Sequence, residues 1–339
     1  MKKLLILLIS ILSLSCASNN NVVNQPSDSL IVTGEIATTF ANTITTADLK
    51  KHLYIIASDD FEGRETGEPG QKKAAEYLKK FYIEHSIASP YGGSDYFQSI
   101  PTEHLRPGLK PSENVIAFIE GNEKPHEIIV VSAHYDHLGM RNGKIYNGAD
   151  DDGSGTVAIL EIAEAFQNAV EKGKGPKRSI LFLHVTGEEK GLLGSKYYTT
   201  YPVFPLEKTV ANLNIDMIGR VDTAHTNNPN FVYLIGSDKL SSELHKLSEE
   251  INSRFTKLEL DYSFNSDDDP NRYYYRSDHY HFAKNNIPII FYFNGTHADY
   301  HRSSDTPDKI NYEILAKRTQ LIFYTAWEIA NRAERIVVD

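Results

Sequence analysis

Short apolar segments rich in β-branched residues alternate with amphipathic patterns along most of this chain of 339 residues. Apolar residues at helical spacing mark residues 47–58, 71–86, 154–170, 192–200, 241–255, 278–285 and 312–333. The strand-like segments cover residues 114–119, 127–133, 178–185, 209–215, 231–235 and 287–293. This alternation favours a mostly parallel sheet with helices on both faces. We therefore predict an α/β protein, long enough to bury the core of one large domain or two small ones.

Polar side chains with nitrogen or oxygen donors suited to metal ions stand at the ends of these segments. They are His134, Asp151, Glu188, Glu189, Asp216 and His301. Three predicted strands end just before His134, the glutamate pair and Asp216, and a predicted helix begins just after Asp151. Because ligands of such sheets gather at the carboxyl ends of the strands, we expect these side chains to meet at one edge.

Four carboxylates at one edge would repel one another and raise each other's pKa values unless cations were present. Two divalent ions would cancel this charge. Three ligand carboxylates and a bridging hydroxide balance four positive charges, which leaves Glu188 free to titrate. Zinc suits histidine and carboxylate ligands, and paired ions roughly 3.5–4 Å apart form a known hydrolytic arrangement. Manganese and cobalt suit the same ligands.

Neighbouring residues at these positions are expected to have different roles. His134 and Asp136 lie two residues apart at a strand end, so their side chains leave the same face. We expect Asp136 to accept a hydrogen bond from the imidazole and fix its tautomer. Adjacent Glu188 and Glu189 cannot easily chelate one ion together, which indicates a metal ligand beside a general base. No such pattern identifies His137 as a metal ligand. We predict that it is structural or that it contacts a metal ligand rather than the metal.

Five local phrases carry a specific resemblance, in order and in spacing. They cover residues 132–137, 148–155, 186–191, 214–217 and 300–306. They resemble the co-catalytic di-zinc aminopeptidase family, the bacterial leucyl aminopeptidase-like zinc exopeptidases of peptidase clan MH. The likeness also reaches residues 58–67, 277–279 and 287–288. It implies a single zinc-exopeptidase (phosphorylase/hydrolase-like) domain over residues 45–339, with a twisted, mostly parallel mixed sheet sandwiched by helices.

The same resemblance implies a metal-dependent aminopeptidase that hydrolyses N-terminal residues from peptides through a hydroxide bridging two zinc ions. It assigns His134 and Asp216 to one zinc and Glu189 and His301 to the other. Asp151 would bridge the two ions, and its peptide bond to Asp152 would be cis. Glu188 matches the general base. Peptides with a free N-terminus are the implied substrates.

A tyrosine three residues before the Ser-Asp-His phrase often holds the oxyanion in this family. Tyr274 has that position here, so with Glu188 and Asp136 it completes the predicted catalytic set. It lies in a run of three tyrosines, so a neighbouring tyrosine, or a packing role for Tyr274, stays open. Asp305 is expected to orient His301 or nearby loops.

Other functions of the same fold leave different marks in the sequence. Glutaminyl cyclases are transferases that use one zinc and tend to lack the acidic stretch kept here at residues 150–153. A carboxypeptidase branch carries an inserted domain, for which residues 87–113 leave too little room. Arg272 and Arg276 nevertheless keep a carboxylate-recognising enzyme open. A catalytically inactive binding lipoprotein would be expected to have lost metal ligands, whereas all five predicted ligands are present in this sequence.

The first residues resemble a bacterial lipoprotein signal peptide. Lys2 and Lys3 precede an apolar run over residues 4–14 and the chain's only cysteine, Cys16. We expect residues 1–16 to be this signal, with a lipid on Cys16, and residues 17–44 to be a flexible tether. The protein would then be anchored in the cell envelope, facing the periplasm, with the outer membrane as one option.

The net charge of the chain limits the classes of partner that it can bind. The formal net charge is −10, so the surface should repel nucleic acid, and no obligate protein partner is evident. The acidic surface should also repel anionic lipid headgroups, so membrane attachment would depend on the lipid on Cys16. The pocket walls come from loops such as residues 258–275, which carry no recognisable code for the side chain preferred at the first substrate position.

Overall fold

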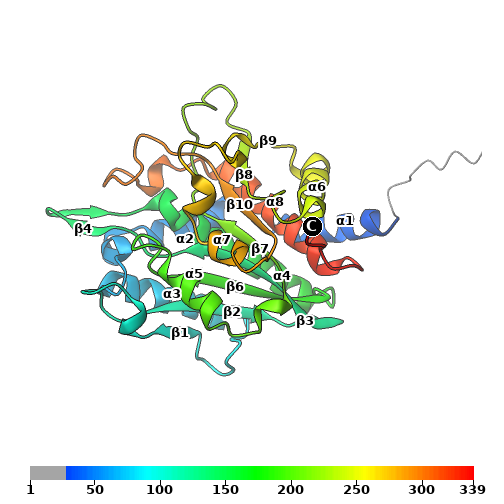
Figure 1. Cartoon of the computed structure of the whole chain (residues 1–339), viewed down its shortest axis with the longest axis horizontal. Helices are drawn as coiled ribbons and strands as arrows, with labels where there is room; N and C mark the ends of the chain where they lie inside the picture. Colours follow the sequence, from blue (N-terminus) through cyan, green and yellow to red (C-terminus); the bar gives the residue numbers. More distant parts are fainter. Residues whose placement is uncertain (1–27) are drawn as a thin grey trace, which may run out of the picture.

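A central eight-stranded sheet organises the molecule, for which a computed structural model describes residues 28–339. The strand order is β1-β2-β6-β3-β7-β10-β8-β9, and β6, β3, β7 and β10 form a parallel block at its centre (Figure 1). The pairs β1 with β2, β2 with β6 and β10 with β8 are antiparallel. The sheet is thus mixed and mostly parallel at its core, as the sequence predicts.

The strands of this sheet are β1 (Phe97–Ile100), β2 (Ser112–Ile119), β3 (Lys124–His134), β6 (Arg178–Val185), β7 (Thr209–Ile215), β8 (Phe231–Ile235), β9 (Glu259–Asp261) and β10 (Ile289–Phe293). A separate hairpin pairs β4 (Gly139–Arg141) with β5 (Lys144–Tyr146). The α-helices are α1 (Asp28–Ala41), α2 (Thr46–Ile56), α3 (Pro69–Glu84), α4 (Gly155–Glu171), α5 (Leu193–Thr200), α6 (Ser242–Ile251), α7 (His279–Ala283) and α8 (Tyr312–Asn331).

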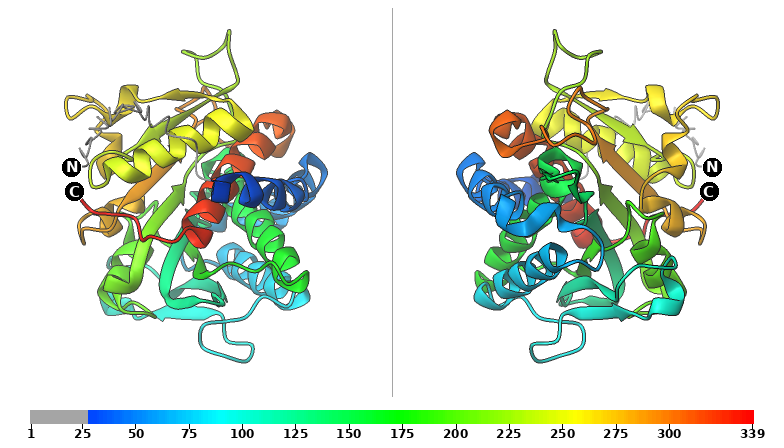
Figure 2. Two further views of the ribbon diagram at one scale, coloured as in Figure 1. Left: turned by 90° about the vertical axis from the view of Figure 1, so that its right-hand side faces the viewer. Right: turned by 90° about the vertical axis from the view of Figure 1, so that its left-hand side faces the viewer.

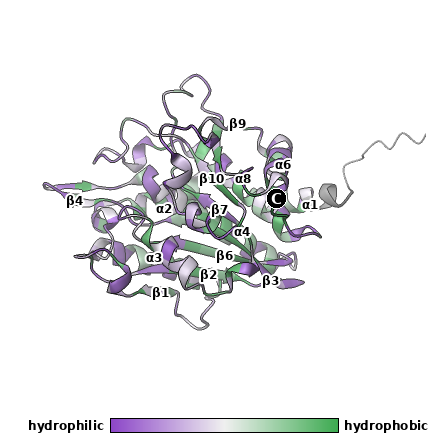
Figure 3. Ribbon diagram, viewed as in Figure 1, coloured by the Kyte–Doolittle hydropathy of each residue, from purple (hydrophilic) through white to green (hydrophobic). Residues whose placement is uncertain are grey.

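The central strands are apolar on both faces because helices cover both. Every residue of β6 and β7 is buried. Along β6, Ile180 and Phe182 join the core cluster formed with α1, α2, α3, α4 and α8, whereas Leu181 and Leu183 face the cluster formed with α5 and α7. Figure 2 shows the two helical layers, and Figure 3 shows apolar residues concentrated in the strands between them. The chain is a single α/β domain.

The tether predicted over residues 17–44 is wrong for the part that the structure describes. Residues Asp28–Ala41 form helix α1. Ala37, Phe40 and Ala41 are buried, and Phe40 stacks on Trp327 of α8 with ring centroids 5.6 Å apart. These buried residues join the main core cluster, and the contact of Phe40 with Trp327 joins segments far apart in the chain, which local composition does not reveal. The predicted signal peptide and the tether's first residues, 1–27, lie outside the described part of the chain.

Most predicted strands and helices are present, and the predicted bounds of β6, β7 and β8 match those found. The sequence patterns do not predict four short strands. Strands β4 and β5 pair in the separate hairpin, whereas β1 and β9 form the two edges of the eight-stranded sheet. Their four and three residues are too few to show a periodic pattern. Within residues 28–339, no helix has both the length and the apolar character needed to cross a bilayer.

Candidate metal centre and active site

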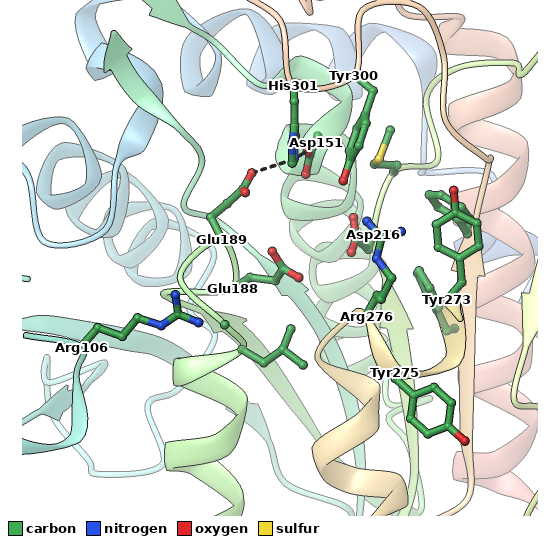
Figure 4. A pocket seen from close by; sticks show the side chains of 15 residues that line it. Arg106, Asp151, Glu188, Glu189, Asp216, Tyr273, Tyr275, Arg276, Tyr300 and His301 are labelled. Atoms are coloured by element: carbon green, nitrogen blue, oxygen red, sulfur yellow. Dashed lines mark ion pairs between the residues drawn. The ribbon is translucent and has the colours of Figure 1, made fainter. Parts of the chain in front are cut away.

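The predicted ligands meet at the carboxyl edge of the parallel strands. His134 is the last residue of β3, Asp216 directly follows β7, and the glutamate pair follows β6 by three residues. A cavity of about 450 Å³ opens there (Figure 4). Its lining includes Asp151, Glu188, Glu189, Asp216 and His301. The expectation that three strands and one helix start deliver these groups to one place is confirmed.

A first cluster joins His134, Asp151 and Asp216. His134 Nε2 lies 3.3 Å from Asp151 Oδ1 and 3.5 Å from Asp216 Oδ1. His134 Nδ1 donates to the main-chain carbonyl oxygen of Asp136 at 3.0 Å, so a neutral ring turns its Nε2 lone pair toward the two carboxylates. The hydroxyl of Ser277 donates to Asp216 Oδ2 at 2.7 Å and holds that carboxylate in place.

The predicted hydrogen bond from His134 to the Asp136 side chain is wrong. The carboxylate oxygen Oδ1 lies 3.8 Å from His134 Nδ1, because the carbonyl of the same residue already accepts that proton. The buried carboxylate of Asp136 instead accepts from the hydroxyl of Thr66 at 2.7 Å and from the main-chain nitrogen of Glu188 at 3.2 Å. Asp136 therefore positions the loop that carries Glu188.

A second cluster lies on the other side of Asp151. His301 Nε2 is 3.1 Å from Asp151 Oδ2 and 3.5 Å from Glu189 Oε1. His137 Nδ1 approaches the same two oxygens, at 3.7 and 2.9 Å. The carboxylate of Asp151 thus presents Oδ1 to the first cluster and Oδ2 to the second, which is the geometry of a bridging ligand. The position of His137 next to Asp136 is the only sign in the sequence that it belongs here.

Asp151 is free for this role because both of its acidic neighbours are used elsewhere. Asp150 Oδ1 accepts from the main-chain nitrogen of Gly219 at 2.7 Å, and its Oδ2 faces His297 Nε2 at 3.1 Å. Asp152 Oδ1 accepts from the main-chain nitrogens of Gly155 and Met217. The peptide bond between Asp151 and Asp152 is cis, as the resemblance implies.

Two buried groups outside the ligand set hold the loops around the site. The Asp305 carboxylate accepts from the main-chain nitrogens of Asp150 and Asp151 at 3.0 and 3.2 Å, so it orients the loop of Asp151. The guanidinium of Arg64 is fully buried and donates to the main-chain carbonyls of Ile56, Tyr135, Asn147 and Gly148. Sequence reasoning did not single out Arg64, although it belongs to the phrase at residues 58–67.

In the second cluster, two side chains have pKa values far from their ordinary values. Burial lowers the pKa of His301, but the nearby carboxylates of Asp151 and Glu189 outweigh it and raise that pKa to about 10. Burial opposes ionisation of Glu189, whereas His137 and His301 bring its pKa down to about 2. The carboxylates thus favour positive charge on the imidazole of His301. Because a metal ion supplies such charge and displaces the imidazole protons, its binding would release protons and depend on pH.

The donor atoms fit a pair of metal ions. His134 Nε2, His137 Nδ1, Asp151 Oδ2 and Glu189 Oε1 are buried without a hydrogen-bond partner. Donors bound to zinc at about 2.0–2.1 Å in tetrahedral geometry lie roughly 3.4 Å from each other. The separations between facing donors, from 2.9 to 3.7 Å, bracket that value. Both clusters can therefore hold an ion of this size.

Glu188 belongs to neither cluster. It lines the cavity, and burial raises its pKa well above the ordinary glutamate value, with repulsion from Asp216, Asp278 and Glu189 adding to the rise. Asp278 lies deeper, and burial raises its pKa to about 7. A carboxylate with a raised pKa at the cavity wall is suited to accept and return a proton.

Tyr274 is not where the resemblance places an oxyanion-holding hydroxyl. Its ring packs over Gly236 and lies 5.2 Å from the Lys239 ammonium, and it is not part of the cavity lining. The hydroxyl-bearing residues that line the cavity are Tyr273, Tyr275 and Tyr300.

Tyr300 lies directly against one of the predicted ligands. Its ring stacks on His301 with centroids 3.9 Å apart, and Figure 4 shows its hydroxyl directed toward Asp216. Burial and the four surrounding carboxylates raise its pKa above the ordinary tyrosine value, so it keeps its proton. The only signal in the sequence was its position directly before a predicted ligand.

Comparisons with known proteins show what this chain is similar to. The model of peptidase family M28 matches residues 114–326. Leupeptin-inactivating enzyme 1 of Streptomyces exfoliatus is 26% identical over 312 residues, 84% of this chain and 62% of that enzyme. The chain spans less than two thirds of the length of the first curated relatives it matches.

Solved structures share the fold. The LapA aminopeptidase of Legionella pneumophila superposes with a TM-score of 0.69 at 22% identity, over 89% of this chain and 76% of that one. A zinc aminopeptidase of Bacillus subtilis superposes with a TM-score of 0.64 at 17% identity, over 87% of this chain and 98% of that one.

Proposed function

The chain belongs to peptidase family M28, and on this premise we propose that it is a zinc-dependent aminopeptidase that removes N-terminal residues from peptides. One observation carries the proposal. Two clusters of metal donors share Asp151 through its two carboxylate oxygens, beside a cavity that also contains Glu188. The names of the structurally similar aminopeptidases point the same way.

His134, Asp151 and Asp216 would hold one ion, and Asp151, Glu189 and His301 the other, with His137 a further nitrogen donor at the second. Bound there, zinc would lower the pKa of a water molecule and polarise the substrate carbonyl. Manganese or cobalt would suit the same donors. Both ions are expected to be needed for full activity.

Glu188 is the proposed general base. It would take a proton from the attacking water and later give it to the leaving amine, which its raised pKa favours. Asp136 would act through Glu188, because it holds the main-chain nitrogen of that residue. The protonated hydroxyl of Tyr300 would donate to the oxyanion, the role that the resemblance had suggested for Tyr274.

The carboxylates at the wall of the cavity suit a free α-amino group on the substrate. The test combines metal analysis with a substrate panel of aminoacyl anilides, N-acetylated peptides and peptides with N-terminal glutamine. We expect two metal equivalents and cleavage of unblocked substrates only. Cleavage of blocked peptides with indifference to unblocked ones would favour a carboxypeptidase, and ring closure of glutaminyl peptides would favour a cyclase. Metal-free protein without turnover would favour a binding lipoprotein.

Attachment to the cell envelope through a lipid on Cys16 remains part of the proposal. It is supported by the charged and apolar pattern of residues 1–16 alone. Fractionation of cells that produce the whole chain or its Cys16→Ala variant tests it: only the whole chain should partition with membranes.

A further inference from the structure

Two arginines line the same cavity, and within residues 28–339 neither of them forms an ion pair with an acidic side chain. Arg106 lies in the segment between β1 and β2, and Arg276 lies between β9 and α7. Ion pairs elsewhere in residues 28–339 engage other arginines, such as Arg178 with Glu127 and Arg220 with Asp299. Figure 4 shows the two cavity guanidinium groups on either side of Glu188. The cavity therefore combines a carboxylate-rich metal site with two available cations.

Both guanidinium groups rest on defined surfaces. The Arg276 guanidinium lies 5.1 Å from the ring of Tyr273, which is buried and packs on Phe293 with centroids 5.0 Å apart. Arg106 lies against Gly191, where an added Cβ would come within 2.4 Å of a guanidinium nitrogen. A side chain at Gly191 would displace Arg106, so the glycine makes room for it.

We propose that this cavity selects substrates that carry a carboxylate close to the scissile bond, bound by Arg276 and Arg106. The inference rests on the proposed aminopeptidase function and names its substrate class. Guanidinium groups bind carboxylates through paired, charge-assisted hydrogen bonds. The carboxylate belongs either to an acidic first residue or to the C-terminus of a short peptide. A dipolar peptide would place its amine at the acidic wall and its carboxylate at the arginines.

Arg272 provides a matched control. It lies four residues before Arg276, is exposed like it, and stacks on the ring of Tyr275 at 4.8 Å, but it is not part of the cavity lining. Loss of its charge changes the net charge of the same segment equally. A general electrostatic effect would therefore appear in Arg272→Gln as well, whereas a contact with substrate would not.

The experiment uses pairs of substrates that differ only in charge. Glutamyl and glutaminyl anilides test the side chain, and a leucyl dipeptide and its C-terminal amide test the terminus. We expect kcat/KM of the zinc-loaded protein to favour the acidic member of at least one pair by about ten- to a hundredfold. Arg276→Gln and Arg106→Gln should each reduce that ratio, and Arg272→Gln should leave it unchanged.

Equal rates within both pairs, or a preference that Arg276→Gln and Arg106→Gln both preserve, would overturn the inference while leaving the aminopeptidase proposal intact. Binding to Glu188→Gln, measured by calorimetry with the dipeptide and its amide and with free glutamate and glutamine, reads the arginines without turnover. If the chain cleaves no peptide, tighter binding of the dipeptide or of glutamate than of their uncharged counterparts still supports the carboxylate site. Equal binding would then reject the carboxylate site together with the aminopeptidase function.

Discussion

The two candidate ion positions share one carboxylate but stand on different kinds of structure. The first uses His134 and Asp216, which lie at the ends of neighbouring strands and are 1% and 12% exposed. The second uses Glu189, in the loop after β6, and His301, in the segment between β10 and α8. The His301 side chain is 40% exposed. Strand ends packed in a sheet hold their side chains more rigidly than loops do.

This difference predicts unequal binding of the two ions. Ligands already in position lose less conformational entropy when the ion binds, so the first position should be the tighter one. Ions in the second position should exchange first under a chelator. The bridging carboxylate of Asp151 would couple the two, because loss of either ion leaves one of its oxygens without a partner.

The largest expected effect concerns the residue that belongs to neither cluster. Glu188→Gln should reduce kcat by about 10²–10⁴-fold because the amide cannot accept the proton, while both ions remain bound. Metal analysis and anilide turnover measure this. The contrasting variant is Asp151→Ala, which should lose both activity and metal since it removes the shared ligand. Full activity of Glu188→Gln would show that another group is the base.

Single-ligand variants should separate the two positions. We expect Asp216→Ala to weaken binding of the tighter ion and His301→Ala that of the looser one, each by more than about a hundredfold, since even partners behind a ligand matter by about 10–100-fold. Competition with a chelating dye gives the two dissociation constants. The comparison would fail if His301→Ala affected the tighter ion instead.

His137 offers a finer test of the second position. Its buried Nδ1 lies 2.9 Å from Glu189 Oε1. In the metal-loaded protein it would either donate a hydrogen bond to that oxygen or bind the ion. His137→Asn keeps an N–H close to Nδ1, so a mere donor would be replaced. We expect this variant to bind the looser ion about tenfold more weakly and to change the visible spectrum of the cobalt-substituted protein. An unchanged spectrum and affinity would leave His137 a hydrogen-bond donor.

The smallest effect concerns helix α4. This helix begins shortly after Asp151, the ligand that both ion positions share. Burial, with repulsion from Glu164, raises the pKa of Glu161 on this helix from 4.5 to about 9. Between these values the folded protein keeps a proton that the unfolded chain releases, so stability falls as pH rises. Each unit of the shift corresponds to about 1.4 kcal/mol in full.

Replacement of Glu161 by glutamine removes this proton equilibrium. The free energy of unfolding of the parent minus that of Glu161→Gln should therefore decrease by at least about 1 kcal/mol from pH 5 to pH 8. Denaturant unfolding of the metal-free proteins measures it, and Glu171→Gln, exposed at the end of the same helix, is the control. A difference independent of pH would show that Glu161 stays ionised in the fold.

Local pattern was sufficient for the strands and for the meeting of the ligands. Residues 178–185 and 209–215 are apolar throughout because both faces of a parallel strand are covered, and the bounds of β6 and β7 follow directly. Parallel strands share one carboxyl edge, so residues placed just after them must lie close together. The order of the phrases then led to the family.

Contacts between distant segments were beyond the reach of local pattern. Helix α1 depends on packing against α8, and the Asp136 side chain depends on Thr66 and on the loop of Glu188. Tyr300 rather than Tyr274 faces the ligands because the segment after β10 stacks it on His301, whereas Tyr274 packs over Gly236. Spacing along a chain sets which side chains leave the same face of a strand or helix, but a side chain's partner is chosen by whatever segment packs against it.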